Sequence, residues 1–197
     1  MVSGLKTVFL GDASVGKSSI SLRITKNCFH EFMGQTVGSA YMFYKTDDRN
    51  FEIWDTAGQE RYANISRLYY RDAYIAILVF DLNDLSTFSR IVSYIIHIKD
   101  VNSLCKIIIV GNKFDLIKDI ESIKEKLEVY KNKYKLYNYL LDDEMNFIMT
   151  SAKNNIGIHD IVDRMISYHD TFTGTYVDSL DDDYCVTSSK KKNNLCC

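Results

Sequence analysis

Short runs of hydrophobic residues alternate with longer amphipathic stretches along most of the chain. The hydrophobic runs predict strands at Lys6–Leu10, Tyr41–Thr46, Asn50–Asp55, Tyr74–Asp81, Lys106–Gly111 and Asn146–Met149. The amphipathic stretches predict helices at Lys17–Lys26, Ser86–Val101, Ile120–Tyr137 and Ile158–His169. Because strands and helices alternate, this order predicts an α/β fold, with a mostly parallel sheet covered by helices on both faces.

Local signals refine this outline. The turn signal Asp47-Asp48-Arg49 joins the second and third strands into a hairpin, which adds an antiparallel strand at the edge of the sheet. Ser86 is a candidate N-cap for its helix. The helical periodicity stops near Thr171, and polar residues dominate from there to Asn194, which predicts disorder. We therefore expect one globular domain over residues 1–170 and a flexible tail over residues 171–197.

Composition and charge narrow the function classes. The 197 residues carry a formal net charge of -2, so no basic field marks nucleic acid as a partner. No apolar leader follows Met1, and the longest apolar run, Tyr74–Phe80, is much shorter than the roughly 20 residues that span a bilayer. The five cysteines show neither metal-ligand nor disulfide-framework spacing, which fits a reducing cytosol.

A glycine-rich motif follows the first predicted strand. Residues 11–18, Gly-Asp-Ala-Ser-Val-Gly-Lys-Ser, match the pattern strand, G-x-x-x-x-G-K-[ST], helix. Backbone N–H groups of such a loop surround phosphate oxygens, while Lys17 supplies a positive charge and the Ser18 hydroxyl ligates magnesium. A chance glycine-rich turn is the alternative, but the flanking strand and helix argue against it. The motif predicts a nucleoside triphosphate site with these phosphate-binding residues: Asp12, Ala13, Ser14, Val15, Gly16, Lys17 and Ser18.

A second motif, Trp54-Asp55-Thr56-Ala57-Gly58-Gln59-Glu60, ends the third predicted strand. In a phosphoryl-transfer site, Asp55 can hold magnesium through water, and the Gly58 N–H can contact the γ-phosphate. Gln59 can orient the attacking water, which makes it the candidate catalytic residue. An ordinary turn after a strand is the alternative. Ligands bind at the carboxyl ends of the strands in such a sheet, where both motifs lie.

A third motif, Asn112-Lys113-Phe114-Asp115, follows the strand Lys106–Gly111. The Asp115 carboxylate can accept hydrogen bonds from N1–H and the amine of guanine, whereas adenine presents an acceptor at N1. The stem of Lys113 can lie over the base, and Asn112 can tie this loop to the phosphate loop. Ser151-Ala152-Lys153 can add a backbone N–H to the guanine carbonyl. Alone the motif is a common polar turn, but after two phosphate motifs it favours guanine over adenine.

Together, these motifs resemble the pattern of the Ras-like small GTPases, in the same order and spacing and with the lone Thr36 of Gln-Thr-Val-Gly. Tyr62, the run Leu68-Tyr69-Tyr70-Arg71 and the terminal pair Cys196-Cys197 resemble the Rab family within them. The resemblance covers residues 5–169 and the tail. It implies a P-loop small GTPase fold, with a six-stranded sheet and five helices, and a GTP/GDP cycle that requires Mg²⁺.

The resemblance also implies roles that the residues alone do not give. Thr36 would ligate magnesium and contact the γ-phosphate, and Phe29 would stack near the base. Residues 32–41 and 58–72 would be two switches, ordered by GTP and loosened after hydrolysis. Tyr41, Trp54 and Tyr69 would form an effector-binding surface. A plain hydrophobic patch is the alternative for these aromatics, and partial core burial is an equal alternative for Trp54.

Regulation and localisation follow from the same resemblance. No arginine stands where it could act in cis on the γ-phosphate, so we expect slow intrinsic hydrolysis and an activating protein. An exchange factor and effectors would be further partners. Cys196 and Cys197 would carry two lipids, which implies an escort protein or dissociation inhibitor and a membrane surface. The expected place is the cytoplasmic face of an intracellular, endosomal membrane, in exchange with the cytosol.

Some features leave alternatives open. Rab proteins usually have Phe where Tyr41 stands, which leaves the choice of effector open. The segment from Asp119 to Asp143 is longer than is usual in the family, and the extra length is either a solvated helix extension or a partner site. Lys190–Lys192 could attract an anionic leaflet or serve as a spacer, and Asp181–Asp183 opposes the attraction. A scaffold that binds GTP with little turnover, and a P-loop ATPase or kinase, are the rival functions.

Overall fold

The structure is a computed structural model that describes residues 4–46, 49–58, 68–141 and 143–184, with the backbone alone for 173–184. In the described part of the chain, six strands form one sheet in the order β2-β3-β1-β4-β5-β6. The strands are β1 (Leu5–Gly11), β2 (Ser39–Thr46), β3 (Arg49–Thr56), β4 (Ile75–Asp81), β5 (Lys106–Asn112) and β6 (Ile148–Met149). β2 pairs antiparallel with β3, and every other neighbouring pair is parallel. The predicted six-stranded, mostly parallel sheet is confirmed.

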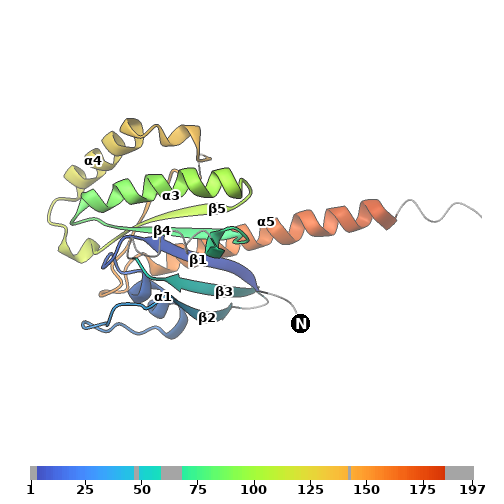
Figure 1. Cartoon of the computed structure of the whole chain (residues 1–197), viewed down its shortest axis with the longest axis horizontal. Helices are drawn as coiled ribbons and strands as arrows, with labels where there is room; N and C mark the ends of the chain where they lie inside the picture. The colour runs from blue at the N-terminus through green and yellow to red at the C-terminus, as the bar shows by residue number, and fades with distance from the viewer. Residues whose placement is uncertain (1–3, 47–48, 59–67, 142, 185–197) are drawn as a thin grey trace, which may run out of the picture.

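Helices cover both faces of this sheet (Figure 1). Helices α3 (Phe88–Val101) and α4 (Ile120–Lys133) pack on one face. Helices α1 (Lys17–Lys26) and α5 (Ile158–Tyr184) pack on the other. Residues 59–67, which make up much of the segment 58–72 predicted as the second switch, lie outside the described residues.

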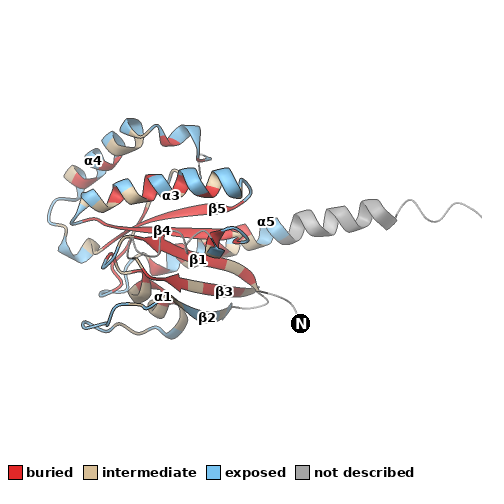
Figure 2. Ribbon diagram, in the orientation of Figure 1, coloured by how far each residue is buried: buried red, intermediate tan, exposed pale blue. Residues whose placement is uncertain are grey.

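Two hydrophobic cores explain the continuous apolar runs of the central strands. Along β1, Val8 and Leu10 point into the core beneath α3 and α4, whereas Phe9 between them points into the core beneath α1 and α5. Every residue of β4 is buried, and Figure 2 shows the central strands buried along most of their length. Successive side chains of a strand face opposite ways, so a strand covered on both faces must be hydrophobic at every position.

The start of α3 differs from the expectation that Ser86 caps it. A 3₁₀ turn, Leu85–Thr87, precedes the helix, and its N-cap is Asp84. Asp84 Oδ1 accepts hydrogen bonds from Ser86 N–H at 3.1 Å and from the Ser86 hydroxyl at 2.6 Å. The carboxylate has two strong acceptor oxygens, so it caps the turn and the predicted serine donates to it.

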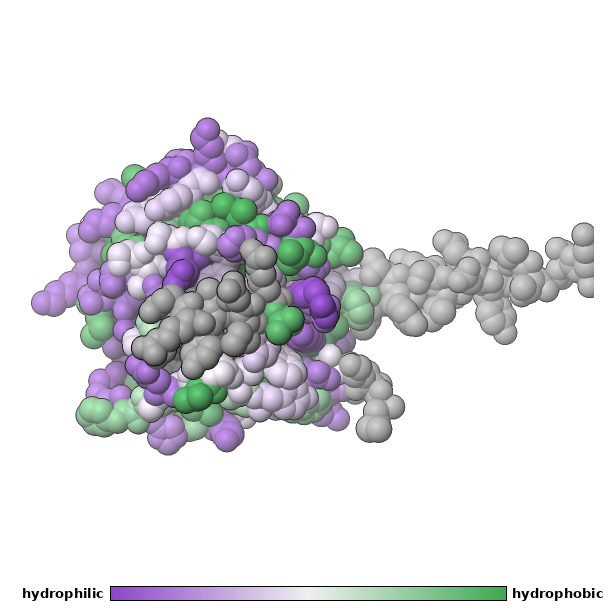
Figure 3. Space-filling model, in the orientation of Figure 1, coloured by the Kyte–Doolittle hydropathy of each residue, from purple (hydrophilic) through white to green (hydrophobic). Residues whose placement is uncertain are grey.

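The helix predicted to run from Ile120 to Tyr137 ends earlier, at Lys133. Lys135 adopts a left-handed conformation with φ 51°, which an α-helix cannot continue through, and a 3₁₀ turn follows at Leu136–Asn138. The break lets Leu136 and Leu140 enter the core beneath α3. Tertiary burial of these leucines therefore overrides the local helical pattern. Mainly hydrophilic side chains cover α4 at the top of Figure 3.

The last two elements also differ from their predicted bounds. β6 contains only Ile148–Met149, and α5 continues to Tyr184 rather than ending near His169. The chain contains no proline, so no ring interrupts the hydrogen bonds of α5 where its amphipathic pattern fades. Residues 185–197, which include Cys196 and Cys197, lie outside the described residues. No helix in the described part of the chain is long and apolar enough to cross a membrane.

Candidate functional site

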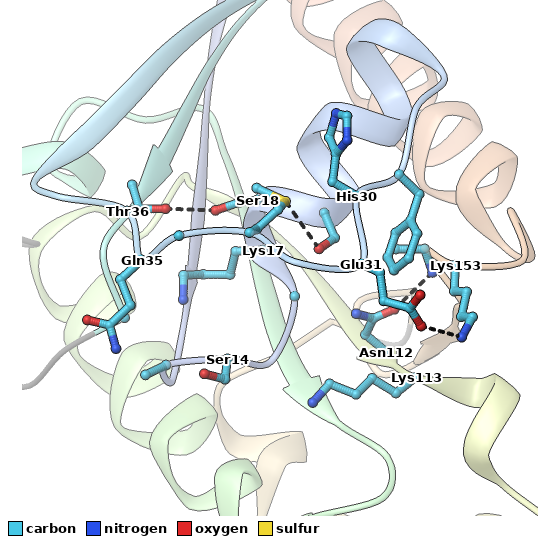
Figure 4. Close-up of a pocket in the computed structure, with 18 of the residues that line it drawn as sticks. Ser14, Lys17, Ser18, His30, Glu31, Gln35, Thr36, Asn112, Lys113 and Lys153 are labelled. Atoms are coloured by element: carbon cyan, nitrogen blue, oxygen red, sulfur yellow. Dashed lines mark hydrogen bonds and ion pairs between the residues drawn. The ribbon is translucent and has the colours of Figure 1, made fainter.

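A cavity of about 510 Å³ lies at the carboxyl ends of the parallel strands. Five segments that are distant in sequence line it: the loop after β1 with the start of α1, residues 29–36, the end of β3, the loop after β5 and the loop after β6. Figure 4 shows side chains from these segments around one opening. The sheet therefore brings the three predicted motifs together, as expected for ligand sites in α/β proteins.

The loop after β1 wraps around the Lys17 side chain. Lys17 Nζ donates hydrogen bonds to the carbonyls of Gly11 at 3.1 Å and Asp12 at 2.7 Å. Burial lowers the pKa of Lys17 to about 8, and the nearby carboxylates of Asp55 and Asp12 oppose that shift. Gly16 has φ 100°, and a Cβ there would lie 2.2 Å from Asn112 Nδ2, so only glycine fits this position.

Three oxygen-bearing side chains meet beside this loop. Ser18 Oγ lies 2.5 Å from Asp55 Oδ2 and 2.8 Å from Thr36 Oγ1, and Figure 4 shows the two hydroxyls facing each other. Asp55 Oδ1 is buried and makes no hydrogen bond with the described residues. Burial raises the pKa of Asp55, against the hydrogen bond from Ser18 and the charge of Lys17. A carboxylate beside two hydroxyls is a donor set that suits Mg²⁺.

The loop after β5 is tied to the phosphate loop through Asn112, as predicted. Asn112 Nδ2 donates to the Val15 carbonyl at 2.9 Å. Asn112 Oδ1 accepts from Thr150 Oγ1 and from Ala152 N–H, each at 3.2 Å. This single buried amide therefore joins the loops after β1, β5 and β6.

Asp115, the residue predicted to recognise the base, lies in the turn that follows Asn112. Asp115 Oδ1 accepts a hydrogen bond from Ser151 Oγ at 2.5 Å, and Ser151 Oγ accepts one from Asn154 N–H at 3.0 Å. These bonds fix the orientation of the carboxylate beside the cavity, which Asp115 lines. Lys113, Ala152 and Lys153 of these loops line the cavity, as does Phe29 in the segment between α1 and β2.

A model of the Ras family matches residues 6–170 of the chain. The chain belongs to the Ras family. It is therefore a small GTPase that binds guanine nucleotide, a class that uses GTP and GDP, typically with Mg²⁺. This match excludes a P-loop ATPase or kinase as the reading of the phosphate motif.

The three aromatic residues predicted as an effector surface lie together on the GTPase. The Trp54 ring centroid is 5.2 Å from that of Tyr41 and 5.8 Å from that of Tyr69. Tyr41 is half exposed, while Trp54 and Tyr69 are partly buried against the core beneath α3. Ser39 Oγ donates to the Tyr69 hydroxyl at 2.9 Å, which links the start of β2 to the segment predicted as the second switch.

Two groups of predicted site residues cannot be placed. Gln59 and Tyr62 fall in residues 59–67, and Cys196 and Cys197 fall in residues 185–197, all outside the described residues. Gly58, next to Gln59, lines the cavity, and a Cβ there would lie 2.5 Å from Lys17 Nζ. The catalytic and lipidation roles of these residues stay predictions.

Sequence reasoning missed three residues that contact the site loops of the GTPase. Asp81, at the end of β4, pairs with Lys113 Nζ at 2.7 Å. Glu31 pairs with Lys153 Nζ at 3.0 Å, and Arg23 donates to main-chain carbonyls of the loop after β6. The position of Asp81 at the carboxyl end of a buried strand was a usable signal, because ligands gather at that edge. No sequence pattern marks Arg23 or Glu31.

Proposed function

We propose that the GTPase is a Rab-type switch attached to membranes, which recruits effectors in vesicular or endosomal trafficking. The single observation that supports a switch most strongly is the Ser18, Thr36 and Asp55 cluster. Thr36 lies in the loop between α1 and β2, so a ligand that binds this cluster also orders the loop. The conformation of residues 32–41 would then depend on whether GTP or GDP is bound.

The roles of the site residues follow from this arrangement. The backbone of residues 12–16 and the Lys17 ammonium hold the phosphates, and Gly58 N–H contacts the γ-phosphate. Ser18 and Thr36 would hold Mg²⁺ directly, and Asp55 would hold it through water. When bound, Mg²⁺ neutralises the charge of the phosphate oxygens. Gln59 orients the attacking water, and an activating protein supplies further positive charge.

The base end of the cavity supports guanine recognition by the same residues. Asp115 accepts from the N1–H and amine of the base, and an N–H of the Ser151-Ala152-Lys153 loop reaches the guanine carbonyl. The stem of Lys113 lies over the base, and Phe29 stacks near it. The Asp81 carboxylate holds the Lys113 ammonium at 2.7 Å, so the stem of Lys113 keeps one direction.

The Rab assignment is supported by the aromatic contact among Tyr41, Trp54 and Tyr69 and by the terminal cysteines of the sequence. The aromatic set lies where β2, β3 and the second switch meet, so its shape can follow the nucleotide. Effectors, an exchange factor and an escort protein or dissociation inhibitor are the proposed partners. A doubly lipidated tail would hold the protein on the cytoplasmic face of a membrane.

Imaging of living cells tests the membrane half of this proposal. A fluorescently tagged full-length chain should mark a discrete set of intracellular membranes, whereas the chain with both Cys196→Ser and Cys197→Ser should be diffuse, since burying no lipid leaves no anchor. Cys28→Ser is the matched control and should localise like the parent. A diffuse parent protein, or membrane binding that survives the double substitution, would contradict the proposed anchor.

A further inference from the structure

Arg23 makes a three-way contact beside the cavity. It lies in the last turn of α1, and its guanidinium donates from Nε to the Ala152 carbonyl at 3.0 Å and from Nη2 to the Lys153 carbonyl at 3.1 Å. Its third donor, Nη1, reaches the Asn27 carbonyl at 3.1 Å. One planar group therefore satisfies three main-chain acceptors at once.

These acceptors belong to the two segments that flank the base end of the cavity. Ala152 and Lys153 lie in the loop after β6, and both line the cavity. Asn27 is the C-cap of α1, in a left-handed conformation with φ 50°, and from it the chain runs on to Phe29 and Thr36. Arg23 thus joins the segment that leads to the first switch to the loop after β6, at the base end of the cavity.

The chemistry of this contact suits arginine and no other side chain. Guanidinium N–H groups lie in one plane at fixed angles, so Nε and Nη2 can bond two consecutive carbonyls while Nη1 bonds a third. The hydrogen bonds are charge-assisted and the Ala152 carbonyl belongs to a buried residue. A lysine ammonium is a point charge on a flexible stem and cannot hold three carbonyls in this arrangement.

An ion pair at the edge of the cavity also joins these two segments. Glu31, in the segment after Asn27, pairs with Lys153 Nζ at 3.0 Å, as Figure 4 shows. Both side chains are more than half exposed, so solvent screens this pair and Arg23 carries the stronger part of the link.

We propose that Arg23 is a positioning residue that holds the loop after β6 against Asn27, where the segment leading to the first switch begins. By doing so, it slows the release of bound guanine nucleotide. The inference rests on the proposed occupation of the cavity by guanine nucleotide. The loop after β6 and the segment that follows Asn27 both line the base end of the cavity, and separating them requires hydrogen bonds of Arg23 to break. Within the described part of the chain, the side-chain hydrogen bonds of Arg23 go to Ala152, Lys153 and Asn27 and to no phosphate-binding residue, so it acts on retention and not on the chemistry of hydrolysis.

The test uses the full chain loaded with magnesium and a fluorescent GDP analogue, with the dissociation rate measured after adding excess GDP. Arg23→Met keeps the apolar stem and removes the donors, and we expect release about tenfold faster, the effect of losing a charge-assisted hydrogen bond. The matched control is Lys26→Met, which removes the same charge from an exposed position in the same turn. That variant should release the analogue at the parent rate.

Two further measurements separate positioning from a general loss of structure. Single-turnover hydrolysis of prebound GTP should proceed at the parent rate in Arg23→Met, whereas a distorted fold would slow it. Arg23→Lys keeps the charge and should release the analogue several-fold faster than the parent, because an ammonium cannot donate to the three carbonyls at once. This variant also serves if Arg23→Met fails to fold.

The outcomes are distinct. A parent protein that does not retain the analogue would overturn the proposed function itself. A parent that retains it while Arg23→Met or Arg23→Lys releases it at the parent rate would overturn only the role of Arg23. Equal acceleration in Lys26→Met would assign the effect to charge alone and would also overturn it.

Discussion

Individual side chains at the base end of the cavity decide which purine the GTPase accepts. Asp115 accepts a hydrogen bond from Ser151 Oγ at 2.5 Å, which leaves its other carboxylate oxygen for a ligand. Guanine offers donors to such an oxygen, whereas adenine offers an acceptor at N1 that would leave the carboxylate unsatisfied. An acceptor that a bound base covers and leaves unpaired is costly, so one residue can discriminate strongly between bases.

Asp115→Asn should therefore shift the preference of the protein from guanine toward xanthine nucleotides, because the new amide can donate to the extra carbonyl of xanthine. Competition between GDP and XDP for the purified protein measures the change, and we expect the ratio of affinities to move by about tenfold or more. Asp100→Asn, at an exposed position in α3, is the control and should leave the ratio as it was. An unchanged ratio in Asp115→Asn would contradict the role of Asp115 in recognising guanine.

At the residue scale, the sequence predicted contacts that follow from local motifs and missed those that depend on the tertiary fold. The tie from Asn112 to the phosphate loop was predictable, because both segments belong to motifs whose relative positions are set by neighbouring strands. Arg23 was not, because two of its three partners are main-chain carbonyls about 130 residues away in the sequence. Main-chain acceptors leave no signature in a sequence.

At the scale of elements, a buried carboxylate anchors the segment between α4 and β6. Glu144 is almost fully buried, and its Oε1 accepts from Ile107 N–H at 2.9 Å, while its Oε2 accepts from Leu141 N–H at 3.0 Å. Lys99 Nζ of α3 lies 3.2 Å from Oε1. This one side chain therefore joins α3, the start of β5 and the segment before β6.

Glu144→Ala should lower the free energy of unfolding by about 3 kcal/mol, because it leaves a mostly buried ammonium and two backbone N–H groups without their acceptor. Urea denaturation followed by circular dichroism measures the loss. Glu121→Ala in α4 removes an exposed ion pair with Lys124 and should change stability by no more than about 1 kcal/mol. Equal stability of the two variants would show that Glu144 does not anchor the segment.

The elements whose bounds were mispredicted have a common physical cause. Periodicity indicated a helix to Tyr137, but the burial of Leu136 and Leu140 required the chain to turn after Lys133. Likewise, Ser86 does not cap α3, because it lies in the 3₁₀ turn before the helix and donates to Asp84, the N-cap of that turn. Element type follows from local pattern, whereas element ends follow from packing and hydrogen bonds that only the fold provides.

At the scale of the whole molecule, the sheet order determines where function lies. Strands β1, β4, β5 and β6 run parallel, so their carboxyl ends share one edge, and β3 adds Asp55 and Gly58 there. The alternating pattern of the sequence predicted this sheet, and the order of the motifs predicted the shared edge. The shape of residues 32–36 around the cavity was not predictable, because a loop without periodic structure takes its course from contacts with distant segments.

Retention of nucleotide by the purified protein tests the central claim most directly. The cavity pairs a lysine-bearing phosphate loop and a magnesium-binding cluster with an acid that reads the base, so the protein should bind GDP or GTP stoichiometrically at micromolar concentration. Removing magnesium with a chelator should release the nucleotide, since the cluster of Ser18, Thr36 and Asp55 would lose its ion. A protein that holds neither GDP nor GTP in the presence of magnesium, or that holds ATP equally well, would contradict the account.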